Sequence, residues 1–290
     1  MHEVEAKALL NRWQGMNLYR GCTHGCIYCD SRSACYQFTH DFEDVEVKRN
    51  APELLEEILR KKRKKFVIST GSMSDPYQPC EKELGLNRRC LQLIDRYGFG
   101  ASVITKSDLV LRDLDLFDSI HRKAKSVLQM TLTVADDALS RVLEPHVCTT
   151  SRRYQVLKVF QQRDIPTVVW MTPLLPFLTD TEENVRRILA YCFDAGVKGI
   201  ICFDAGMTLR EGNREYYYRA LDRHFPGLSA EYRKRYGSAY EVASPNRAAL
   251  MRIFREECEK YGVLHEPSAC FAYIAAIPER QEQLSMFDGM

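Results

Sequence analysis

The run Asn17-Leu-Tyr-Arg-Gly-Cys-Thr-His-Gly-Cys-Ile-Tyr-Cys-Asp30 places three cysteines, Cys22, Cys26 and Cys29, in the spacing Cys-x3-Cys-x2-Cys. One short loop therefore carries three thiolates, with no obvious fourth ligand beside them. Iron-sulfur clusters are held by cysteine thiolates, and a four-iron cluster has four ligand positions. Three protein ligands would leave one iron open to a small molecule, so the spacing favours a cluster with a free coordination position.

The composition around this loop indicates a globular α/β protein. The chain has 290 residues, of which 45% are hydrophobic and 28% charged, enough for one large domain or two small ones. Its net charge of +2 gives no strong field that selects a polyanion. The start of the chain lacks a secretory pattern and no run approaches ~18 apolar residues, so we expect a cytoplasmic protein without a membrane span and with reduced cysteines.

Strand-like and helix-like segments alternate along the chain. Strands are expected at Met16–Tyr19, Phe66–Thr70, Ala101–Thr105, Val127–Val134, Thr167–Met171 and Gly199–Phe203. Helices are expected between them at Pro52–Lys65, Leu84–Tyr97, Asp113–Ala124, Ser151–Gln162 and Glu182–Ala195. Parallel neighbours need such long crossovers, so the pattern predicts a parallel sheet, and an open doubly wound sheet and a barrel fit it equally well. After about residue 225 the pattern stops, and one helix, Pro245–Tyr261, and then Phe271–Ile277 are expected.

Polar residues gather where the expected strands end. They are Cys22, Ser72, Asp75, Lys106, Thr131, Glu144 and Thr172, each at or just past a strand's carboxyl end. Barrel enzymes place their chemistry at that rim, so this distribution favours a barrel with its site there.

The cysteine spacing, with Tyr28 directly before the third cysteine, resembles that of the radical S-adenosylmethionine (SAM) enzymes. Four further runs, in the same order, resemble the spore photoproduct lyase-like (DNA repair photolyase-like) branch: Ser74–Pro79, Val103–Lys106, Leu143–Pro145 and Pro173–Pro176. The resemblance covers roughly residues 15–205. It implies an α/β fold, a partial (β/α)6 TIM-like barrel, with a radical SAM core at 1–225, a small C-terminal helical extension at 226–280 and a flexible tail at 281–290.

The resemblance also implies a chemistry. A [4Fe-4S] cluster would be held by Cys22, Cys26 and Cys29, and its open iron would bind SAM. One electron, from a donor such as flavodoxin or ferredoxin, would cleave SAM to a 5′-deoxyadenosyl radical that takes a hydrogen atom from the substrate. The alternative is a zinc site completed by Cys35 or His24, in a nucleic-acid adaptor without catalysis.

Cofactor-binding residues follow from the same resemblance. Tyr28 would pack against the adenine. Ser72, Ser74 and Asp75 offer acceptors for the ammonium of the methionine moiety, and a strand-end turn is the alternative interpretation. Lys106 would reach the cofactor's carboxylate in a charge-assisted contact.

Four further residues are assigned from their positions. Thr131 and Thr133 alternate along one strand and would face the ribose hydroxyls if that face is the lumen, unless they are there for β-propensity alone. Glu144 and Arg153 would hold the cofactor or pair with each other, with a surface ion pair as the competing interpretation.

The chain departs from the lyase at one place. The lyase carries a hydrogen-donor cysteine just before its Ser-Asp pair, and this chain has Ser72 there. A hydroxyl is a far poorer hydrogen-atom donor than a thiol. Cys80, five residues past Asp75, is a speculative substitute.

The substrate is the least determined part. Gln283–Phe287 resembles the short peptide by which bacterial repair proteins dock on the sliding clamp, and an ordinary hydrophobic tail is the alternative. Basic runs at Arg60–Lys65 and, with interleaved tyrosines, at Arg214–Arg219 and Tyr232–Tyr236 suit nucleic acid only weakly. Nucleic acid is the leading substrate class, and a protein or peptide is the other.

Overall fold

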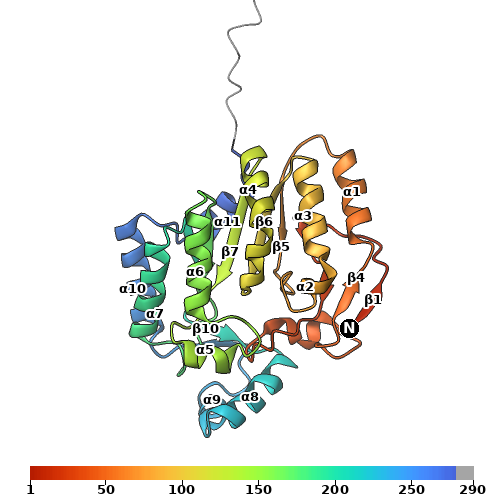
Figure 1. Ribbon diagram of the computed structural model, residues 1–290. Helices are drawn as coiled ribbons and strands as arrows, with labels where there is room; N and C mark the ends of the chain where they lie inside the picture. Colours follow the sequence, from red (N-terminus) through yellow and green to blue (C-terminus); the bar gives the residue numbers. More distant parts are fainter. Residues whose placement is uncertain (279–290) are drawn as a thin grey trace, which may run out of the picture.

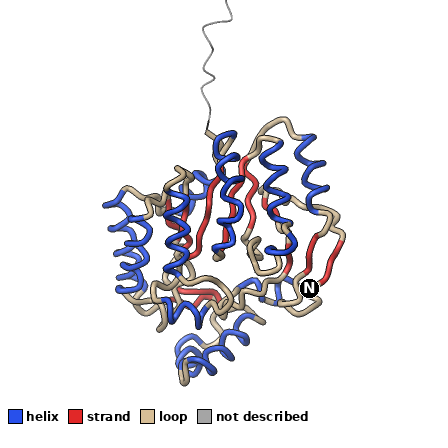
Figure 2. The backbone as a smooth tube through the Cα atoms, viewed as in Figure 1, coloured by secondary structure: helices blue, strands red, loops and turns tan. Residues whose placement is uncertain are grey.

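The centre of the protein is a six-stranded parallel sheet, seen in a computed structural model that describes residues 1–278 (Figure 2). The strand order, β2-β5-β6-β7-β8-β9, follows the chain without the reversal of a doubly wound sheet, and β2 and β9 do not pair with each other, so the sheet is a partial barrel. The bounds are Gly15–Met16, Val67–Thr70, Gly100–Thr105, Ser126–Thr131, Thr167–Trp170 and Gly199–Ile201, in that order. All six expected strands are present, so the predicted α/β fold with a parallel sheet is confirmed.

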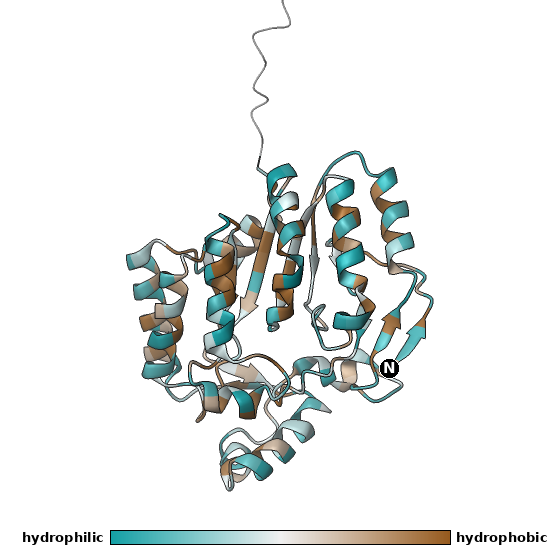
Figure 3. Ribbon diagram, viewed as in Figure 1, coloured by the Kyte–Doolittle hydropathy of each residue, from teal (hydrophilic) through white to brown (hydrophobic). Residues whose placement is uncertain are grey.

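Helices cover the outer, convex face of this sheet (Figure 1). They are α1 (Ala51–Lys61), α3 (Leu86–Arg96), α4 (Leu114–Lys123), α6 (Thr150–Gln161) and α7 (Glu182–Asp194), with α10 (Arg247–Tyr261) packed on α7. Each is amphipathic: in α1, for example, Pro52 stands in the first turn and Leu55 and Leu59 are buried. Figure 3 shows the hydrophobic residues on the strands and the inner helix faces, with hydrophilic residues outside.

The inner, concave face is partly filled by α11 (Pro267–Ala275). Cys270 and Ile274 of this helix form a buried cluster with one inward side chain from each of three strands, Val127, Val168 and Ile201. These three residues lie near the amino ends of β7 and β8 and at the last residue of β9. The helix therefore covers the inner face at the amino ends of β7 and β8. Its Phe271 also reaches the carboxyl ends of β8 and β9, with its ring 5.9 Å from that of Trp170 and 6.3 Å from that of Phe203.

A small sheet leads into the cysteine loop. Its strands are β1 (His2–Val4), β4 (Glu46–Lys48) and β3 (Tyr19–Arg20), with β1 parallel and β3 antiparallel to β4. The expected strand Met16–Tyr19 is thus divided between two sheets, β2 ending at Met16 and β3 beginning at Tyr19. Two short 3-10 turns, Asp30–Arg32 and Ala34–Tyr36, follow the loop.

Residues 206–243 form one excursion between β9 and α10. It runs through β10 (Gly206–Thr208), α8 (Asn213–His224), α9 (Leu228–Tyr236) and β11 (Glu241–Ala243), and β10 pairs antiparallel with β11. The helix expected at Pro245–Tyr261 is confirmed as α10, but the expectation that it stood alone before Phe271–Ile277 was wrong, because α9 and β11 precede it and α11 begins already at Pro267. The division at residue 225 stays a prediction, although the rings of Tyr217 and Tyr232 pack 5.5 Å apart across it.

The basic and aromatic clusters have structural places. Tyr217, Tyr218 and Tyr232 are buried in the core of the excursion rather than displayed for stacking. The run Arg60–Lys65 begins in the last turn of α1 and precedes the amino end of β5, at the opposite end of the sheet from its carboxyl rim. Arg60 lies 3.7 Å from Glu56 there. Among the described residues no helix is long and apolar enough to cross a membrane.

Candidate active site

A cavity of about 700 Å³ opens at the carboxyl ends of the central strands. Most of the predicted site residues line it: Cys22, Cys26, Tyr28, Cys29, Ser72, Ser74, Asp75, Lys106 and Thr131. The structure therefore brings together side chains from the cysteine loop, the loop after β5, and the ends of β6 and β7. Four predicted residues are not in the lining, namely Cys80, Thr133, Glu144 and Arg153.

The cysteine loop is held by its backbone. Cys22 N donates to the carbonyl of Phe42 at 3.1 Å, and Ile27 N donates to the carbonyl of Leu143 at 3.0 Å. Gly21 has φ +93°, and a Cβ there would lie 2.4 Å from the Phe42 oxygen, so glycine is required at this close approach. The loop geometry is thus set by contacts on both sides, which fixes where the thiols point.

The spread of the three sulfurs distinguishes between the two metal interpretations. A single zinc ion binds sulfur at about 2.3 Å, which brings its ligands close to one another. Within the described residues, the sulfurs of Cys22, Cys26 and Cys29 do not all lie within 4.8 Å of one another. The three residues whose ligand atoms do lie that close together are His2, His40 and Glu46. Ligands of a four-iron cluster bind different irons, so the wider spacing fits a cluster better than one zinc ion.

His24, considered above as a fourth zinc ligand, contacts Asp75 instead. Its Nδ1 lies 3.3 Å from Asp75 Oδ2, and both side chains are buried. Burial lowers the pKa of His24, but the Asp75 charge outweighs this and raises the pKa to about 10. Burial raises the pKa of Cys22, and interaction with the His24 cation brings it below its ordinary value. His24 therefore stabilises a thiolate beside it.

Both carboxylate oxygens of Asp75 are occupied by contacts within the protein. Its Oδ1 accepts from Tyr77 N at 2.8 Å and from Thr105 Oγ1 at 2.7 Å, and its Oδ2 accepts from Lys106 N at 2.8 Å and faces His24. A carboxylate has about four acceptor positions, and these four contacts occupy them. Burial raises the pKa of Asp75, but the His24 charge and these hydrogen bonds bring it below its usual value. Asp75 thus joins three segments of the site.

The two serines of the same loop differ. Ser74 is buried and its hydroxyl donates to the carbonyl of Tyr19 at 2.7 Å, so it anchors the loop on β3. Ser72 is exposed to the cavity. Gly71, at the end of β5, has φ +101°, and a Cβ there would lie 2.0 Å from the carbonyl oxygen of Ile104. The glycine lets the loop pass close over β6.

The ammonium of Lys106 is an unpaired cation in the cavity. Nζ lies 5.9 Å from the centre of the Tyr28 ring, and within the described chain no carboxylate or carbonyl is at hydrogen-bond distance from it. Burial lowers the pKa of Lys106, but the acidic and thiol groups around it, Cys26 and Glu144 first, raise it above the ordinary value. The lysine is therefore charged and free to bind an anion.

A buried polar chain stands behind the cavity wall. The Tyr28 hydroxyl donates to Glu144, and Glu144 pairs with Arg153, with both charged side chains at 0% exposure. Arg153 also donates to the carbonyl of Thr131 at 2.8 Å and of Cys148 at 3.0 Å. The surface ion-pair interpretation was wrong because the pair is fully buried. It positions Tyr28 and the end of β7 and does not itself line the cavity.

Two predicted residues lie just outside the site. Thr131 is the last residue of β7 and lines the cavity, whereas β7 ends before Thr133, which is fully buried outside the lining. Cys80 precedes the short helix α2 (Glu81–Leu84) and is also outside the lining. Burial raises the pKa of Cys80 to about 11, which keeps the thiol protonated, but its place outside the lining gives no support to a hydrogen-donor role.

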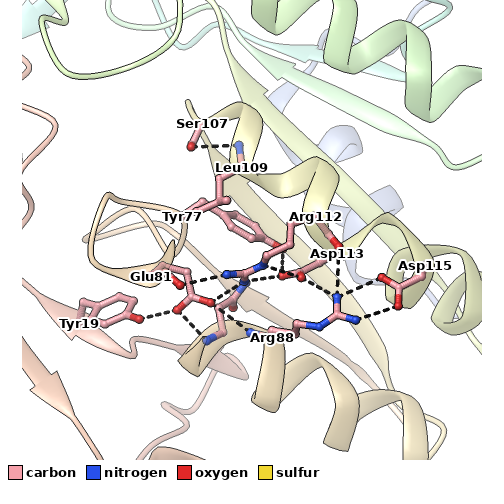
Figure 4. A network of polar contacts seen from close by, with 10 residues as sticks. Tyr19, Tyr77, Glu81, Arg88, Ser107, Leu109, Arg112, Asp113 and Asp115 are labelled. Carbon is pink, nitrogen blue, oxygen red and sulfur yellow. Dashed lines mark hydrogen bonds and ion pairs between the residues drawn. The ribbon is translucent and has the colours of Figure 1, made fainter. Parts of the chain in front are cut away.

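A polar network holds Tyr77, in the loop that also carries Ser72 and Asp75 (Figure 4). The Tyr77 hydroxyl donates to Asp113 at 3.0 Å, and Arg112 binds both Asp113 and Glu81. Tyr19 donates to Glu81 at 2.5 Å, so the network reaches back to β3. These contacts connect the cysteine loop, the loop after β5 and the start of α4 into one frame.

Sequence reasoning missed the far wall of the cavity. Trp170 and Phe203 line it from β8 and just beyond β9, and Trp170 Nε1 donates to Gln129 Oε1 at 2.7 Å. Residues of the excursion complete the wall: Gly206, Met207, Thr208, Glu241, Val242 and Ala243. The alternation of inward side chains was a usable pattern for Trp170, but nothing in the sequence marked the β10–β11 pair.

Comparisons with known proteins agree with this architecture. Residues 16–189 match the family model described as the Radical SAM superfamily. The uncharacterized protein Rv2578c of Mycobacterium tuberculosis is 29% identical over 299 residues, covering 96% of this chain and 86% of that protein. The uncharacterized protein MJ0683 of Methanocaldococcus jannaschii is 35% identical over 170 residues, covering 58% of this chain and 62% of that protein.

Solved structures of spore photoproduct lyase share the fold. The lyase complexed with dinucleoside spore photoproduct has a TM-score of 0.59 at 12% identity, covering 86% of this chain and 74% of that one. A mutant of it with bound AdoMet and the same dinucleoside has a TM-score of 0.60 at 12% identity, with the same coverage. At these identities the likeness concerns the fold alone.

Proposed function

This chain belongs to the radical SAM superfamily, and from that premise we propose that Cys22, Cys26 and Cys29 hold a [4Fe-4S] cluster at which SAM binds inside the cavity. Membership of the family implies an enzyme with these two cofactors and an external reductant. When bound, the cluster supplies the electron that cleaves SAM to a 5′-deoxyadenosyl radical, which takes a hydrogen atom from the substrate. The protein supplies binding, orientation and exclusion of competing reactions.

The observation that carries the proposal is the shared cavity of three thiols and one unpaired cation. Cys22, Cys26 and Cys29 line the same space as Lys106, whose ammonium has no anionic partner at contact distance within the described residues. SAM offers a carboxylate for such a cation. The three sulfurs do not all lie within 4.8 Å of one another, which fits ligands of different irons better than ligands of one zinc ion.

The other lining residues have roles that their positions support. The Tyr28 ring provides a flat apolar wall for the adenine, with its orientation set by the hydrogen bond to Glu144. Ser72 offers a hydroxyl that accepts from the ammonium of SAM, and Thr131 offers one to the ribose. Asp75 acts indirectly, because its oxygens already hold Lys106 N, Thr105, Tyr77 and His24.

The far wall keeps water and side reactions out. Trp170, Met207 and Val242 add apolar surface to the lining, and Met207 and Val242 share a buried cluster with Cys26 and Tyr28 of the cysteine loop. The β10–β11 pair closes this side, since Gly206 approaches the carbonyl of Val242 so closely that a Cβ would lie 2.5 Å from it. A reactive radical formed in such a space meets the bound substrate before it meets solvent.

We further propose that the substrate is nucleic acid and the reaction lyase-like. The cavity lining includes Phe203, 57% exposed, and Arg247, whose side chain is 60% exposed and pairs through Nε with Asp204 at 2.8 Å. An exposed aromatic face stacks on a base, and a guanidinium binds phosphate. The fold is shared with a lyase solved with a dinucleoside photoproduct. Ser72 at the place of the lyase's donor cysteine favours a reaction that differs in its last hydrogen transfer.

The cluster proposal is tested by anaerobic reconstitution with iron and sulfide, followed by reduction with SAM present. We expect the parent and a Cys35→Ala control, a substitution of an exposed cysteine outside the main cavity, to form 5′-deoxyadenosine. A Cys26→Ala variant should form almost none. Equal formation by Cys26→Ala and the parent, or no labile sulfide in the parent, would overturn the proposal.

The substrate proposal needs its own experiment. Formation of 5′-deoxyadenosine is compared with ultraviolet-irradiated DNA, undamaged DNA and a mixed peptide pool as additives. We expect stimulation by DNA that falls in a Phe203→Ala variant. Stimulation by peptides alone would favour the protein-substrate alternative.

The clamp-docking prediction at Gln283–Phe287 lies outside the described residues. It is tested by capture of the protein on immobilised sliding clamp, with and without residues 283–287. Undiminished capture after the deletion would remove this argument for DNA.

A further inference from the structure

Two histidines and a glutamate meet on the small sheet that precedes the cysteine loop. His2 lies on β1 and Glu46 on β4, and the two residues are direct partners in the parallel ladder. His40 comes from the loop between the second 3-10 turn and β4. We propose that His2, His40 and Glu46 bind a divalent transition-metal ion, with zinc as the expected occupant, at a site separate from the cysteine loop.

The first argument is convergence. One ligand atom from each of these three residues lies within 4.8 Å of the others. The rings of His2 and His40 meet edge to face, with centroids 4.9 Å apart. Such proximity requires only small movements to bring three ligands onto one ion, because zinc binds nitrogen and oxygen at about 2.0–2.2 Å.

The second argument is the orientation of the imidazoles. His2 Nδ1 lies 2.9 Å from Asp44 Oδ2, and His40 Nδ1 lies 2.9 Å from the carbonyl oxygen of Asp41. A carbonyl accepts only, so His40 Nδ1 carries the proton and its Nε2 has a free lone pair in the neutral ring. Metal-binding histidines usually donate their other ring N–H to a carboxylate or a backbone carbonyl. Both histidines show this arrangement.

The third argument is what the ligand atoms lack. His40 Nε2 is buried and has no hydrogen-bond partner. Glu46 has a side chain 18% exposed, and within the described residues its ion-pair contact is His40 Nε2 at 3.8 Å, too long for a hydrogen bond. A proton on His40 Nε2 would satisfy only the contact between His40 and Glu46. A metal cation bound by His2, His40 and Glu46 would satisfy the ligand atoms of all three residues. Buried acceptors without donors are costly, which favours the cation.

The ligand set selects the kind of metal. Two imidazoles and one carboxylate suit zinc and related first-row ions, while magnesium and calcium prefer oxygen alone. Three protein ligands leave a position for water, and His2, with its side chain 39% exposed, provides a route from solvent. No thiolate takes part, so this site and the cysteine loop would select different metals.

The consequence is structural. The loop that carries His40 also carries Phe42, whose carbonyl accepts from Cys22 N, and the ring of Phe38 lies 5.4 Å from that of His40 and 5.2 Å from that of Phe42. An ion held by His2 and Glu46 would fix this loop against the small sheet. It would thereby hold the backbone on which the first cysteine stands.

The test is zinc content of the full chain, purified without a polyhistidine tag and measured by mass spectrometry after dialysis. To remove zinc bound by thiolates, the comparison uses a Cys22→Ala/Cys26→Ala/Cys29→Ala background. We expect about one zinc per chain in that background, unchanged by His265→Gln and lost in His40→Gln and Glu46→Gln. His265 is a matched control because its Nε2 lies 3.9 Å from Glu259 and Glu266 without a second histidine.

A graded variant adds a second readout. Asp44→Asn keeps the three ligands and weakens the partner of His2, together with an ion pair of Asp44 to the amino group of Met1 at 2.6 Å, so zinc affinity should fall about 10- to 100-fold, as is usual for such partners. If the chain with all three cysteines replaced does not fold, the same variants are compared in the chain with its cysteines intact and the cluster loaded, where iron occupies the thiolates. Absence of zinc from the background, or its retention by both His40→Gln and Glu46→Gln, would overturn the inference. Neither result bears on 5′-deoxyadenosine formation, so the two proposals fail separately.

Discussion

Asp75 Oδ2 lies 3.3 Å from His24 Nδ1, and this buried contact ties the loop after β5 to the cysteine loop. The same carboxylate holds the backbone N–H of Lys106 and the hydroxyl of Thr105. One side chain thus fixes the relative positions of the proposed cluster ligands and the proposed SAM-binding cation, which explains why a charge is buried at this place.

Replacing this carboxylate should therefore be costly. In Asp75→Asn the amide offers one acceptor oxygen and a donor group that faces other donors. We expect a loss of about 3–5 kcal/mol in the free energy of unfolding, as for a broken buried ion pair, measured by urea denaturation. Asp108→Asn, which breaks an exposed contact of 2.8 Å to Arg152, should cost no more than about 1 kcal/mol. Equal losses in the two variants would contradict this account.

Lys106 should set the affinity for SAM. Lys106→Met removes a charge-assisted hydrogen bond worth about 1.5–3 kcal/mol, so SAM should bind roughly 10- to 150-fold more weakly. Equilibrium dialysis of cluster-loaded protein measures this, with iron and sulfide content held equal. Lys158→Met, which removes a cation paired with Asp194 at the surface, should leave the affinity unchanged. Unaltered binding by Lys106→Met would place the SAM carboxylate elsewhere.

Arg153 and Arg152 are neighbours on α6 with opposite environments. Arg153→Met leaves Glu144 buried without its cation and should lower the free energy of unfolding by about 3–5 kcal/mol. Arg152→Met affects an exposed pair and should cost at most about 1 kcal/mol. Because the buried partners share one network, adding Glu144→Gln to Arg153→Met should cost less than the sum of the single changes. Additive losses would show that the two side chains act independently.

Glu144 also predicts a pH dependence of stability. Burial raises its pKa, but Arg153 and Lys106 outweigh this, and the pKa in the folded protein lies below the unfolded value of about 4.3. The unfolded chain therefore binds more protons in the window between the two values. The stabilisation is present above the unfolded pKa and is lost as pH falls through the folded pKa. Between pH 7 and acid pH, the free energy of unfolding of Glu144→Gln should fall less steeply than that of the parent. Parallel plots of unfolding free energy against pH would count against the ion pair.

Gly71 and Gly98 both have positive φ, but only Gly71 is crowded. A Cβ at Gly71 would lie 2.0 Å from the Ile104 oxygen, whereas at Gly98 nothing lies within 4 Å. Gly98→Ala should cost about 1–2 kcal/mol for its left-handed backbone, and Gly71→Ala distinctly more. Thermal denaturation compares the two, and SAM affinity should fall only in Gly71→Ala. Similar melting temperatures would mean that the loop moves aside easily.

The central sheet was predictable because buried parallel strands are near-continuous apolar runs. The same property made the expected strand Val127–Val134 longer than β7, which ends at Thr131. Leu132 and Val134 are buried beyond the end of the strand, so the apolar run continues past it. The pair β10–β11 was not predictable, because strands of three residues show no period and pair across a long excursion.

The site divides in the same way. The cysteine spacing and Lys106 at a strand end carried enough information to be found from sequence alone. The contact of His24 with Asp75, and the meeting of His2 with His40, depend on tertiary structure that spacing does not encode. Arg153 was identified, but its burial was not, since a charged helix residue usually faces solvent.

The position of α11 on the inner face has a kinetic consequence. Cys270 and Ile274 pack on Val127, Val168 and Ile201 and so block the inner face away from the cavity, and in the proposed enzyme reactant and product would share the mouth at Phe203 and Arg247. In the proposed reaction, 5′-deoxyadenosine must then leave before the next SAM molecule binds, so we expect added 5′-deoxyadenosine to compete with SAM.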